Sequence, residues 1–278
     1  MKFDKTNSTY QALQLLERKF RGKIVRPIKQ FLFIDKAEKG LRNIFILPIE
    51  KIIFKNKLRT ATPIIIYQMG KVASTSIHRS LLSQYPGAVA FSHSLDEPHW
   101  RAELVYDWFK KGNTVKIITL TREPIARNIS GFYQWFENYV GVPFWKSTHS
   151  IKELQSIFYE KYDHTWALEW FDKNIKRYFD IDLYEKPFPR IGYGIYKNNN
   201  AEVLVIKAEA DNAIKEQAIR EYLELPNFVL QVVNVGSEKF YAKSYKQFKS
   251  SFDLTESYRK MIEESKYYIH FYGDDAFR

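Results

Sequence analysis

The sequence between residues 63 and 77 decides the fold, and it reads Pro63-Ile64-Ile65-Ile66-Tyr67-Gln68-Met69-Gly70-Lys71-Val72-Ala73-Ser74-Thr75-Ser76-Ile77. The β-branched run after Pro63 is typical of a buried strand, and the hydroxyl residues 74–76 can cap the helix that follows. Backbone N–H groups, the positive end of the helix dipole, hydroxyl donors and the Lys71 ammonium therefore converge after the strand. Each of these features favours an anion, so the stretch predicts a cradle for a phosphate or a phosphosulfate.

A second strand-turn-helix unit follows within residues 115–133. An apolar strand leads into Arg122, and Pro124 lies in the first turn of the next predicted helix. Two apolar strands that are each followed by a polar turn and a helix indicate a parallel sheet whose ligand lies at the carboxyl ends of the strands. Arg122 and Ser130 can reach one anion only if that helix runs beside the ligand. This geometry suits a second phosphate, separate from the first.

The rest of the chain supplies further strands and helices around these two units. We expect strands at residues 88–91, 193–196, 203–207 and 227–233, with the second and third forming a hairpin, and helices at about 75–84, 98–110, 211–223 and 255–264. Residues 135–180 are expected to be helical and are rich in tryptophan and tyrosine. Aromatic faces stack on sugar rings, so this segment can recognise an acceptor, although aromatic packing between helices explains any single residue equally well.

Composition and charge limit the class of protein. The 278 residues suffice for one large α/β domain or two small ones. A formal net charge of +11 favours acidic partners, but it does not choose among nucleotides, nucleic acid, anionic polysaccharide and anionic membrane. The absence of cysteine excludes disulfides, thiolate catalysis and Cys-ligated zinc. No signal peptide or membrane-spanning window is recognisable, so we expect a soluble, cytoplasmic protein.

Residues 1–60 differ from the remainder of the chain. Six basic residues and no acidic residue lie between Arg18 and Lys29, and a second amphipathic stretch runs from Leu41 to Phe54. We predict a basic amphipathic helical extension. Either it packs on the domain with a solvated basic edge, or residues 18–54 make a peripheral contact with an anionic membrane or an acidic polymer.

The two strand-turn-helix units resemble the donor-binding motifs of sulfotransferases that use 3′-phosphoadenosine-5′-phosphosulfate (PAPS). Residues 71–76 look like the loop by which that family holds the 5′-phosphosulfate. Residues 122–133 resemble its 3′-phosphate motif, in which a serine follows an arginine by eight residues. The carbohydrate O-sulfotransferases and bacterial capsular polysaccharide synthesis proteins are the most similar. Ala73 stands where many members of the family have glycine.

The resemblance covers residues 62–135 and, more loosely, residues 190–272. It implies a P-loop-like central parallel sheet flanked by helices within a sulfotransferase-like α/β domain, residues 61–278. In this interpretation residues 1–60 are the N-terminal extension, and residues from about 135 to 180 are a helical insert that recognises the acceptor. The implied reaction moves a sulfuryl group from PAPS to a hydroxyl of a carbohydrate, most simply a polysaccharide, which can be acidic, or its precursor. Neither a metal ion nor a nucleic acid is expected to take part.

Sulfuryl transfer passes a loose electrophile between two oxygens, so catalysis depends on alignment and on stabilising charge on the departing phosphate. Lys71 is the residue that we assign to the departing phosphate. The residues assigned to donor binding surround the two phosphates: Gly70, Val72, Ala73, Ser74, Thr75, Ser76, Arg122, Ser130, Gly236 and Lys239. The last two lie in a loop that resembles the one that closes over the adenine and the 3′-phosphate in the family.

The acceptor hydroxyl must also lose its proton, which requires a base within hydrogen-bonding reach. His93 follows the strand at 88–91 and is expected at the same edge of the sheet as the cradle. The resemblance implies that His93 is this base. The alternatives are nearby or on the middle helices: His99, Glu97, Asp96, His149 and His164.

Two other functions stay open. A nucleoside-triphosphate kinase would also use a phosphate cradle, but the sequence lacks a complete Gly-x-x-x-x-Gly-Lys-Ser/Thr motif and a clear magnesium-holding aspartate at a strand end. A basic module could instead bind acidic glycan or membrane without catalysis. That module would show salt-sensitive binding that survives loss of the cradle.

Overall fold

The computed structural model describes residues 46–231 and 240–273. Its first helix, α4 (Leu47–Lys57), belongs to a unit separate from that of the sheet and is considered by itself. Pro48 lies in the first turn of α4, and Lys55 and Lys57 lie in its last turn, where they complement the helix dipole. The basic stretch at residues 18–29 lies outside the described residues. Among the helices that the structure does describe, none has the length and apolarity needed to cross a membrane.

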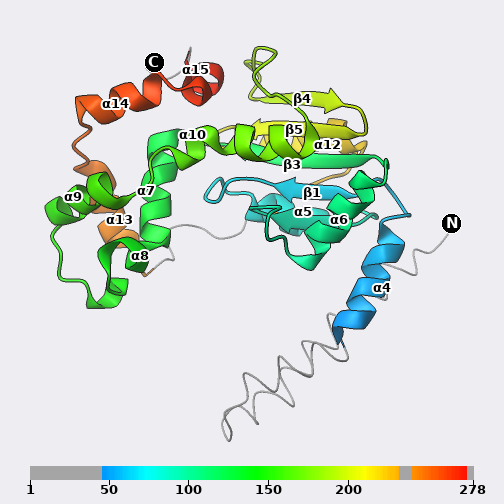
Figure 1. The fold of residues 1–278 in the computed structure, drawn as a ribbon, viewed down its shortest axis with the longest axis horizontal. Helices are drawn as coiled ribbons and strands as arrows, with labels where there is room; N and C mark the ends of the chain where they lie inside the picture. Colours follow the sequence, from blue (N-terminus) through cyan, green and yellow to red (C-terminus); the bar gives the residue numbers. More distant parts are fainter. Residues whose placement is uncertain (1–45, 232–239, 274–278) are drawn as a thin grey trace, which may run out of the picture. The chain divides into compact units, whose positions relative to one another are not determined.

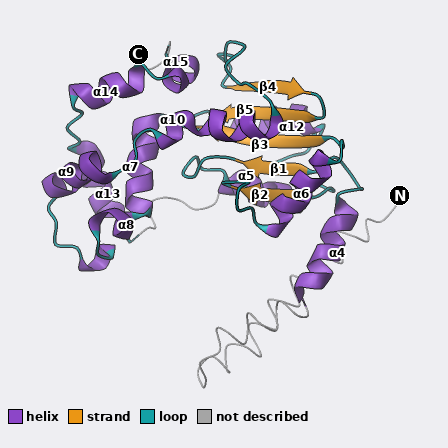
Figure 2. Cartoon of the chain, viewed as in Figure 1, coloured by secondary structure: helices purple, strands orange, loops and turns teal. Residues whose placement is uncertain are grey.

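A five-stranded sheet in the order β2-β1-β3-β5-β4 forms the centre of the second unit (Figures 1 and 2). Its strands are β1 (Ile64–Tyr67), β2 (Val89–Ser92), β3 (Val115–Thr121), β4 (Tyr193–Asn198) and β5 (Ala201–Lys207). The first four strands in this order pair in parallel, whereas β4 is antiparallel to β5. The predicted α/β class with a central sheet flanked by helices is confirmed, and so is the predicted hairpin.

Helices cover both faces of the sheet. Helix α5 (Thr75–Gln84) connects β1 to β2, and α6 (Trp100–Lys110) connects β2 to β3. Because parallel crossovers are right-handed and these two run in opposite directions, α5 and α6 lie on opposite faces. Helix α12 (Asn212–Leu223) packs on β5 and β4, and its Tyr222 ring lies 4.5 Å from the Nζ atom of Lys116 on β3.

The strand predicted at residues 227–233 does not form in its described part, residues 227–231. Gln84 of α5 pairs twice with Val229, donating from Nε2 to the carbonyl at 2.7 Å and accepting from the amide at Oε1 at 2.9 Å. Arg220 of α12 donates from Nε to the Phe228 carbonyl at 2.8 Å. Side chains of two helices therefore satisfy backbone groups that strand pairing would have used.

The helix after β3 does not return along the sheet. Helix α7 (Pro124–Gln134) instead joins a group that contains α8 (Phe136–Val140), the short 3₁₀ helix η3 (Phe144–Lys146), α9 (Ile151–Lys161) and α13 (Ala242–Ser250) (Figure 1). Aromatic rings hold this group together. Phe132, Phe158 and Phe248, from α7, α9 and α13, lie with ring centroids 5.5–6.0 Å apart.

The remaining helices close the sheet and its carboxyl edge. Residues 166–179 form one helical stretch made of α10 (Trp166–Phe171), the π-helix η4 (Asp172–Lys176) and α11 (Arg177–Phe179). Trp170 in this stretch packs on Tyr67 of β1, with ring centroids 5.0 Å apart. Helices α14 (Glu256–Glu263) and α15 (Lys266–Tyr272) follow α13. The Tyr267 hydroxyl of α15 contacts both backbone groups of Arg122, so this helix fixes the turn after β3.

Candidate functional site

The loop between β1 and α5 has a backbone that suits an anion. Lys71 and Ala73 have φ angles of 75° and 61°, whereas Gly70 and Val72 have no positive φ and Ser74 is right-handed with φ at −71°. Residues that carry a Cβ pay about 1–3 kcal/mol for such angles, and these residues gather at ligand sites. Alternation of left- and right-handed residues points successive backbone N–H groups into one concavity that binds anions. We call residues 70–76 the cradle.

The hydroxyl groups of the cradle do not cap the helix that follows. Ser74 occupies the N-cap position of α5 but its side chain makes no cap hydrogen bond, which corrects the expected capping role. No hydrogen bond of the Ser74 or Thr75 hydroxyl occurs among the described residues. The first turn of α5 also contains no acidic residue. Within the described residues the hydroxyls of Ser74 and Thr75 therefore remain able to bind a ligand at the positive end of the α5 dipole.

Two arginines of the second strand-turn-helix unit hold the cradle. Arg122 donates from Nη1 to the Lys71 carbonyl at 2.6 Å, and Arg127 donates from Nε to the Gly70 carbonyl at 3.3 Å. Neither arginine has a carboxylate within ion-pairing distance in the described part of the chain. Among the described residues, both positive charges therefore lie beside the cradle without an ion-pair partner.

Arg127 is the functional candidate that the sequence analysis missed. Its side chain is 1% exposed, donates to Asn128 Oδ1 at 3.1 Å and to the Tyr162 hydroxyl at 2.9 Å, and lies 4.4 Å from the Trp166 ring centroid. Burial lowers the pKa of Arg127 below its ordinary value. Burying a cation among neutral groups costs several kcal/mol, so the position of this charge requires an explanation. The signal in the sequence was the helical spacing of Arg127 from Ser130 and Gln134, three and seven residues later.

That spacing defines the face of α7 that runs beside the cradle. Arg127 contacts Gly70, and Gln134 accepts a hydrogen bond from Lys71 Nζ at 3.1 Å. Ser130 lies between Arg127 and Gln134 on the same face. The structure thus brings Lys71, Arg122 and the helix face of Ser130 together, as the sequence required if one ligand is to reach both phosphate motifs.

His93 lies beside the first residue of the cradle. A Cβ atom added to Gly70 would lie 3.9 Å from His93 Cε1 and 3.4 Å from the ring of Trp135, which is 40% exposed. The His93 Nδ1 atom lies 2.9 Å from the Gln68 carbonyl and 3.2 Å from Gln68 Nε2. If Nδ1–H donates to the carbonyl, Nε2 keeps its lone pair and can accept a proton. Gln68 therefore orients an exposed imidazole at the mouth of the cradle.

The alternative bases have other roles in the structure. His99 caps α6 by accepting from a backbone amide, and Asp96 accepts from a tyrosine hydroxyl and pairs with an arginine. His149 contacts a serine hydroxyl at 3.1 Å, and Glu97 is exposed in the loop before α6. His164 packs between two aromatic rings at 4.6 Å, and burial lowers its pKa. Of these histidines, His93 is the one that adjoins Gly70.

Two of the residues predicted to bind the donor, Gly236 and Lys239, lie outside the described residues. Within the described residues, no group of three or more His, Cys, Asp or Glu side chains is arranged to hold a metal ion.

Comparison with known proteins identifies one similarity. Residues 146–273 match the model of a family described as "Putative capsular polysaccharide synthesis protein". The matched segment is less than half of the chain, and it contains neither the cradle nor α7. No curated protein and no solved structure gave a significant match. The similarity to capsular polysaccharide synthesis proteins that the sequence indicated is thus supported over the second half of the chain.

Proposed function

We propose that this protein is a PAPS-dependent sulfotransferase that acts on a carbohydrate hydroxyl. The observation that carries the proposal is the cradle, in which Lys71 and Ala73 are left-handed and the carbonyls of Gly70 and Lys71 accept from two arginines that have no carboxylate partner among the described residues. Such a site favours a ligand with more than one negative charge. A bisphosphorylated donor would use both the cradle and the Arg122–Ser130 side, which is the P-loop-like arrangement that the resemblance implies.

In this proposal the two phosphates of the donor are bound by different groups of residues. The backbone N–H groups of residues 70–76 and the hydroxyls of Ser74, Thr75 and Ser76 bind the 5′-phosphosulfate. Arg122 and Ser130 bind the 3′-phosphate. Ala73 takes the position where many sulfotransferases have glycine, and its φ of 61° is a physical reason for glycine there, because glycine adopts that angle without strain.

The transfer step needs one base and one stabilising cation. His93 Nε2 accepts the proton of the acceptor hydroxyl as the acceptor oxygen forms its bond to sulfur. The bond between sulfur and the bridging oxygen breaks, and its electron pair stays on the 5′-phosphate. Lys71 stabilises that negative charge, and Gln134 positions its ammonium group.

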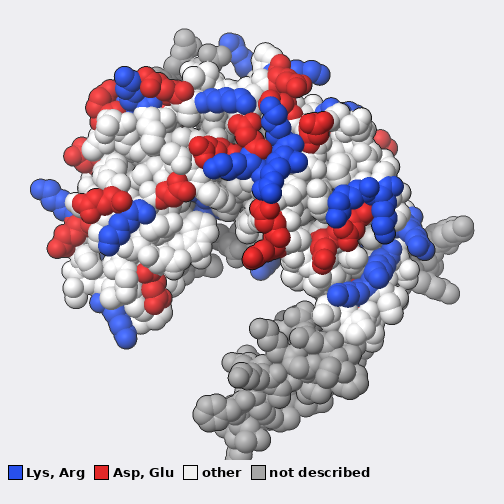
Figure 3. Space-filling model, in the orientation of Figure 1, with Lys and Arg blue, Asp and Glu red and all other residues white. Residues whose placement is uncertain are grey.

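The similarity to a capsular polysaccharide synthesis family favours a polysaccharide or its precursor as the acceptor. A cytoplasmic enzyme with a peripheral membrane contact suits such a role. The observation that favours the contact is α4, where Ile49 and Ile52 are 47% and 61% exposed on a helix that also carries lysines. A purely basic binding module is less favoured, because acidic side chains are interspersed with basic ones on the face shown in Figure 3.

The proposal is tested with Lys71→Met and His93→Gln. Both variants are expected to bind adenosine 3′,5′-bisphosphate, with Lys71→Met weakened about tenfold, and both are expected to lose sulfate transfer from PAPS by a factor of about 10² or more. Lys260→Gln changes an exposed side chain of α14, so it serves as the control and should leave both measurements unchanged. Unchanged sulfate transfer by Lys71→Met would contradict the proposal.

A further inference from the structure

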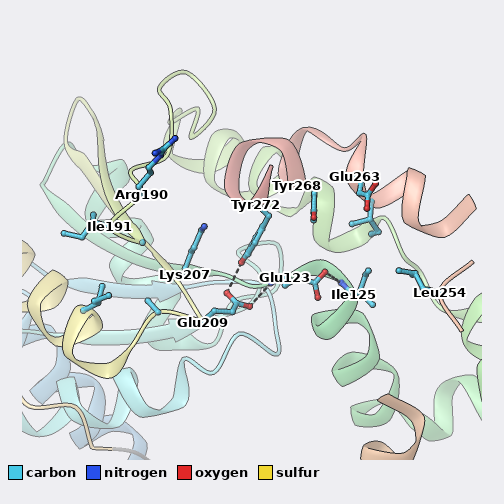
Figure 4. Close-up of a pocket in the computed structure, with 14 residues that line it drawn as sticks. Glu123, Ile125, Arg190, Ile191, Lys207, Glu209, Leu254, Glu263, Tyr268 and Tyr272 are labelled. Carbon is cyan, nitrogen blue, oxygen red and sulfur yellow. Dashed lines mark hydrogen bonds between the residues drawn. The ribbon is translucent and has the colours of Figure 1, made fainter. Parts of the chain in front are cut away.

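A cavity of about 570 Å³ opens at the carboxyl ends of β3 and β5 (Figure 4). Its walls come from the first turn of α7, the segment before β4, the end of β5 with the turn after it, the start of α12, Leu254, and helices α14 and α15. Glu123, which lines it, directly follows Arg122 of the donor side, so the cavity adjoins the proposed donor site along the sheet edge. The volume is typical of small-molecule sites.

One wall of the cavity is fixed by hydrogen bonds. Glu209 accepts from the Glu123 backbone amide at 2.9 Å and from the Tyr272 hydroxyl at 3.0 Å, as the dashed lines in Figure 4 show. Glu123 accepts from the amides of Ile125 and Ala126 at 2.8 and 2.7 Å. Each carboxylate oxygen can accept a further bond, so these two side chains are held in place and still able to accept from a ligand.

The other side of the cavity is basic. Lys207, at the end of β5, places its Nζ 5.1 Å from the Tyr272 ring centroid, and Arg190 extends from the segment before β4 (Figure 4). Arg190 is exposed and forms no ion pair among the described residues. The cavity thus has two cations, Arg190 and Lys207, on the β-strand side and carboxylates near α7 and α14, where Glu263 adds a third carboxylate.

Apolar and aromatic side chains complete the lining. Ile191, Ile214 and Ile262 belong to the walls, and so do the rings of Tyr268 and Tyr272. A ligand that fits must therefore present an apolar face together with hydroxyl donors and one anionic group. A ligand with several phosphates fits poorly, because two cations cannot neutralise several negative charges beside three carboxylates, whereas a single anionic group can lie next to Arg190 and Lys207.

We propose that this cavity binds an acidic sugar residue of the acceptor, namely a pyranose ring that carries a carboxylate. Arg190 and Lys207 bind the sugar carboxylate, the glutamates accept from the ring hydroxyls, and Tyr268 and the isoleucines cover the C–H face of the ring. The assignment of this sugar to the acceptor rests on the proposed function. It identifies the substrate class as a polysaccharide that contains uronic acid.

The test compares two ligands that differ in one group. A short uronic-acid oligosaccharide and its carboxyl-reduced neutral counterpart are titrated calorimetrically into the full chain, into Arg190→Gln and into Arg190→Gln/Lys207→Gln. The wild-type protein should prefer the acidic oligosaccharide, and the double variant should bind it about 10–100-fold more weakly, as expected for the loss of charged hydrogen bonds. Arg190→Gln changes an exposed side chain, so it reports on binding even if the double variant folds poorly.

Adenosine 3′,5′-bisphosphate is titrated into the same proteins, with Lys260→Gln as a charge-matched control on α14 outside the cavity. Retained bisphosphate affinity together with lost oligosaccharide affinity supports the inference. Equal binding of the acidic and neutral oligosaccharides by the wild-type protein overturns it, and so does a parallel loss of bisphosphate affinity, which would assign the cavity to the donor. A wild-type protein that distinguishes the oligosaccharides but does not bind the bisphosphate would support the binding of an acidic sugar in the cavity, and it would contradict the proposed function together with the assignment of that sugar to the acceptor.

Discussion

Replacing Arg127 by methionine should weaken donor binding strongly while it changes the free energy of unfolding only slightly. The guanidinium reaches the Gly70 carbonyl, so a phosphate in the cradle would lie about 8 Å from its charge, where a unit charge pair contributes about 2 kcal/mol at an effective dielectric constant of about 20. We therefore expect Arg127→Met to weaken adenosine 3′,5′-bisphosphate binding about thirty-fold. Stability should change by only about 1–2 kcal/mol, because the lost hydrogen bonds are offset by removing a buried charge.

Isothermal titration gives the dissociation constant, and urea unfolding gives the free energy of unfolding. Arg127→Lys keeps the charge but loses the planar fork, so its affinity should be intermediate. Arg220→Met is the matched control, because Arg220 also donates to a backbone carbonyl from a helix, but on α12. The reasoning is refuted if folded Arg127→Met binds the bisphosphate within about a factor of two of wild type, or no more weakly than Arg220→Met does.

Two further changes test packing and titration. In Gly131→Ala the new Cβ would lie 2.1 Å from the Tyr162 hydroxyl, so urea unfolding should show a free energy of unfolding lower by about 1–3 kcal/mol. Adding Tyr162→Phe to the same chain should recover part of this loss. An unchanged free energy of unfolding in Gly131→Ala would contradict this packing. Burial lowers the pKa of His78 to about 4, below the ordinary 6.5. Between these two pH values the unfolded chain binds more protons than the folded chain, so the free energy of unfolding rises with pH across that window. His78→Phe should reduce this rise by about 2 kcal/mol, after allowance for the partly exposed ring, and an unchanged pH profile of the unfolding free energy would count against it.

The sequence was sufficient for those parts of the fold that depend on local patterns. The run at residues 64–67 is apolar and that at 115–121 is mainly so, as expected of strands that are buried on both faces, and such runs identify buried strands. The hairpin of β4 and β5 followed from a polar turn between two apolar strands. The strand predicted from the same kind of pattern at residues 227–231 was wrong. Phe228 and Leu230 alternate and are buried as in a strand, but side chains of α5 and α12 bind the backbone there.

The candidate site was predictable only in part. The order of residues in the cradle and at Arg122 indicated anion binding, because these signals lie within a few positions of one another. The helical spacing of Arg127 from Ser130 was not enough to predict its role, since an arginine in a helix is usually solvated and its burial depends on Tyr162 and Trp166, more than thirty residues away. The cavity beside Glu123 was not predictable from local patterns, because its walls come from segments far apart in the sequence.

The central claim is that the protein holds a ligand by two phosphates at once. The most direct test titrates adenosine 3′,5′-bisphosphate and adenosine 5′-monophosphate into the full chain under identical conditions, with magnesium–ATP as a third ligand. The account predicts that the bisphosphate binds at least about a hundred-fold more tightly than the monophosphate, since the 3′-phosphate adds contacts with Arg122 worth about 3 kcal/mol. Equal affinity for the two adenosine phosphates, or a preference for magnesium–ATP, would contradict it.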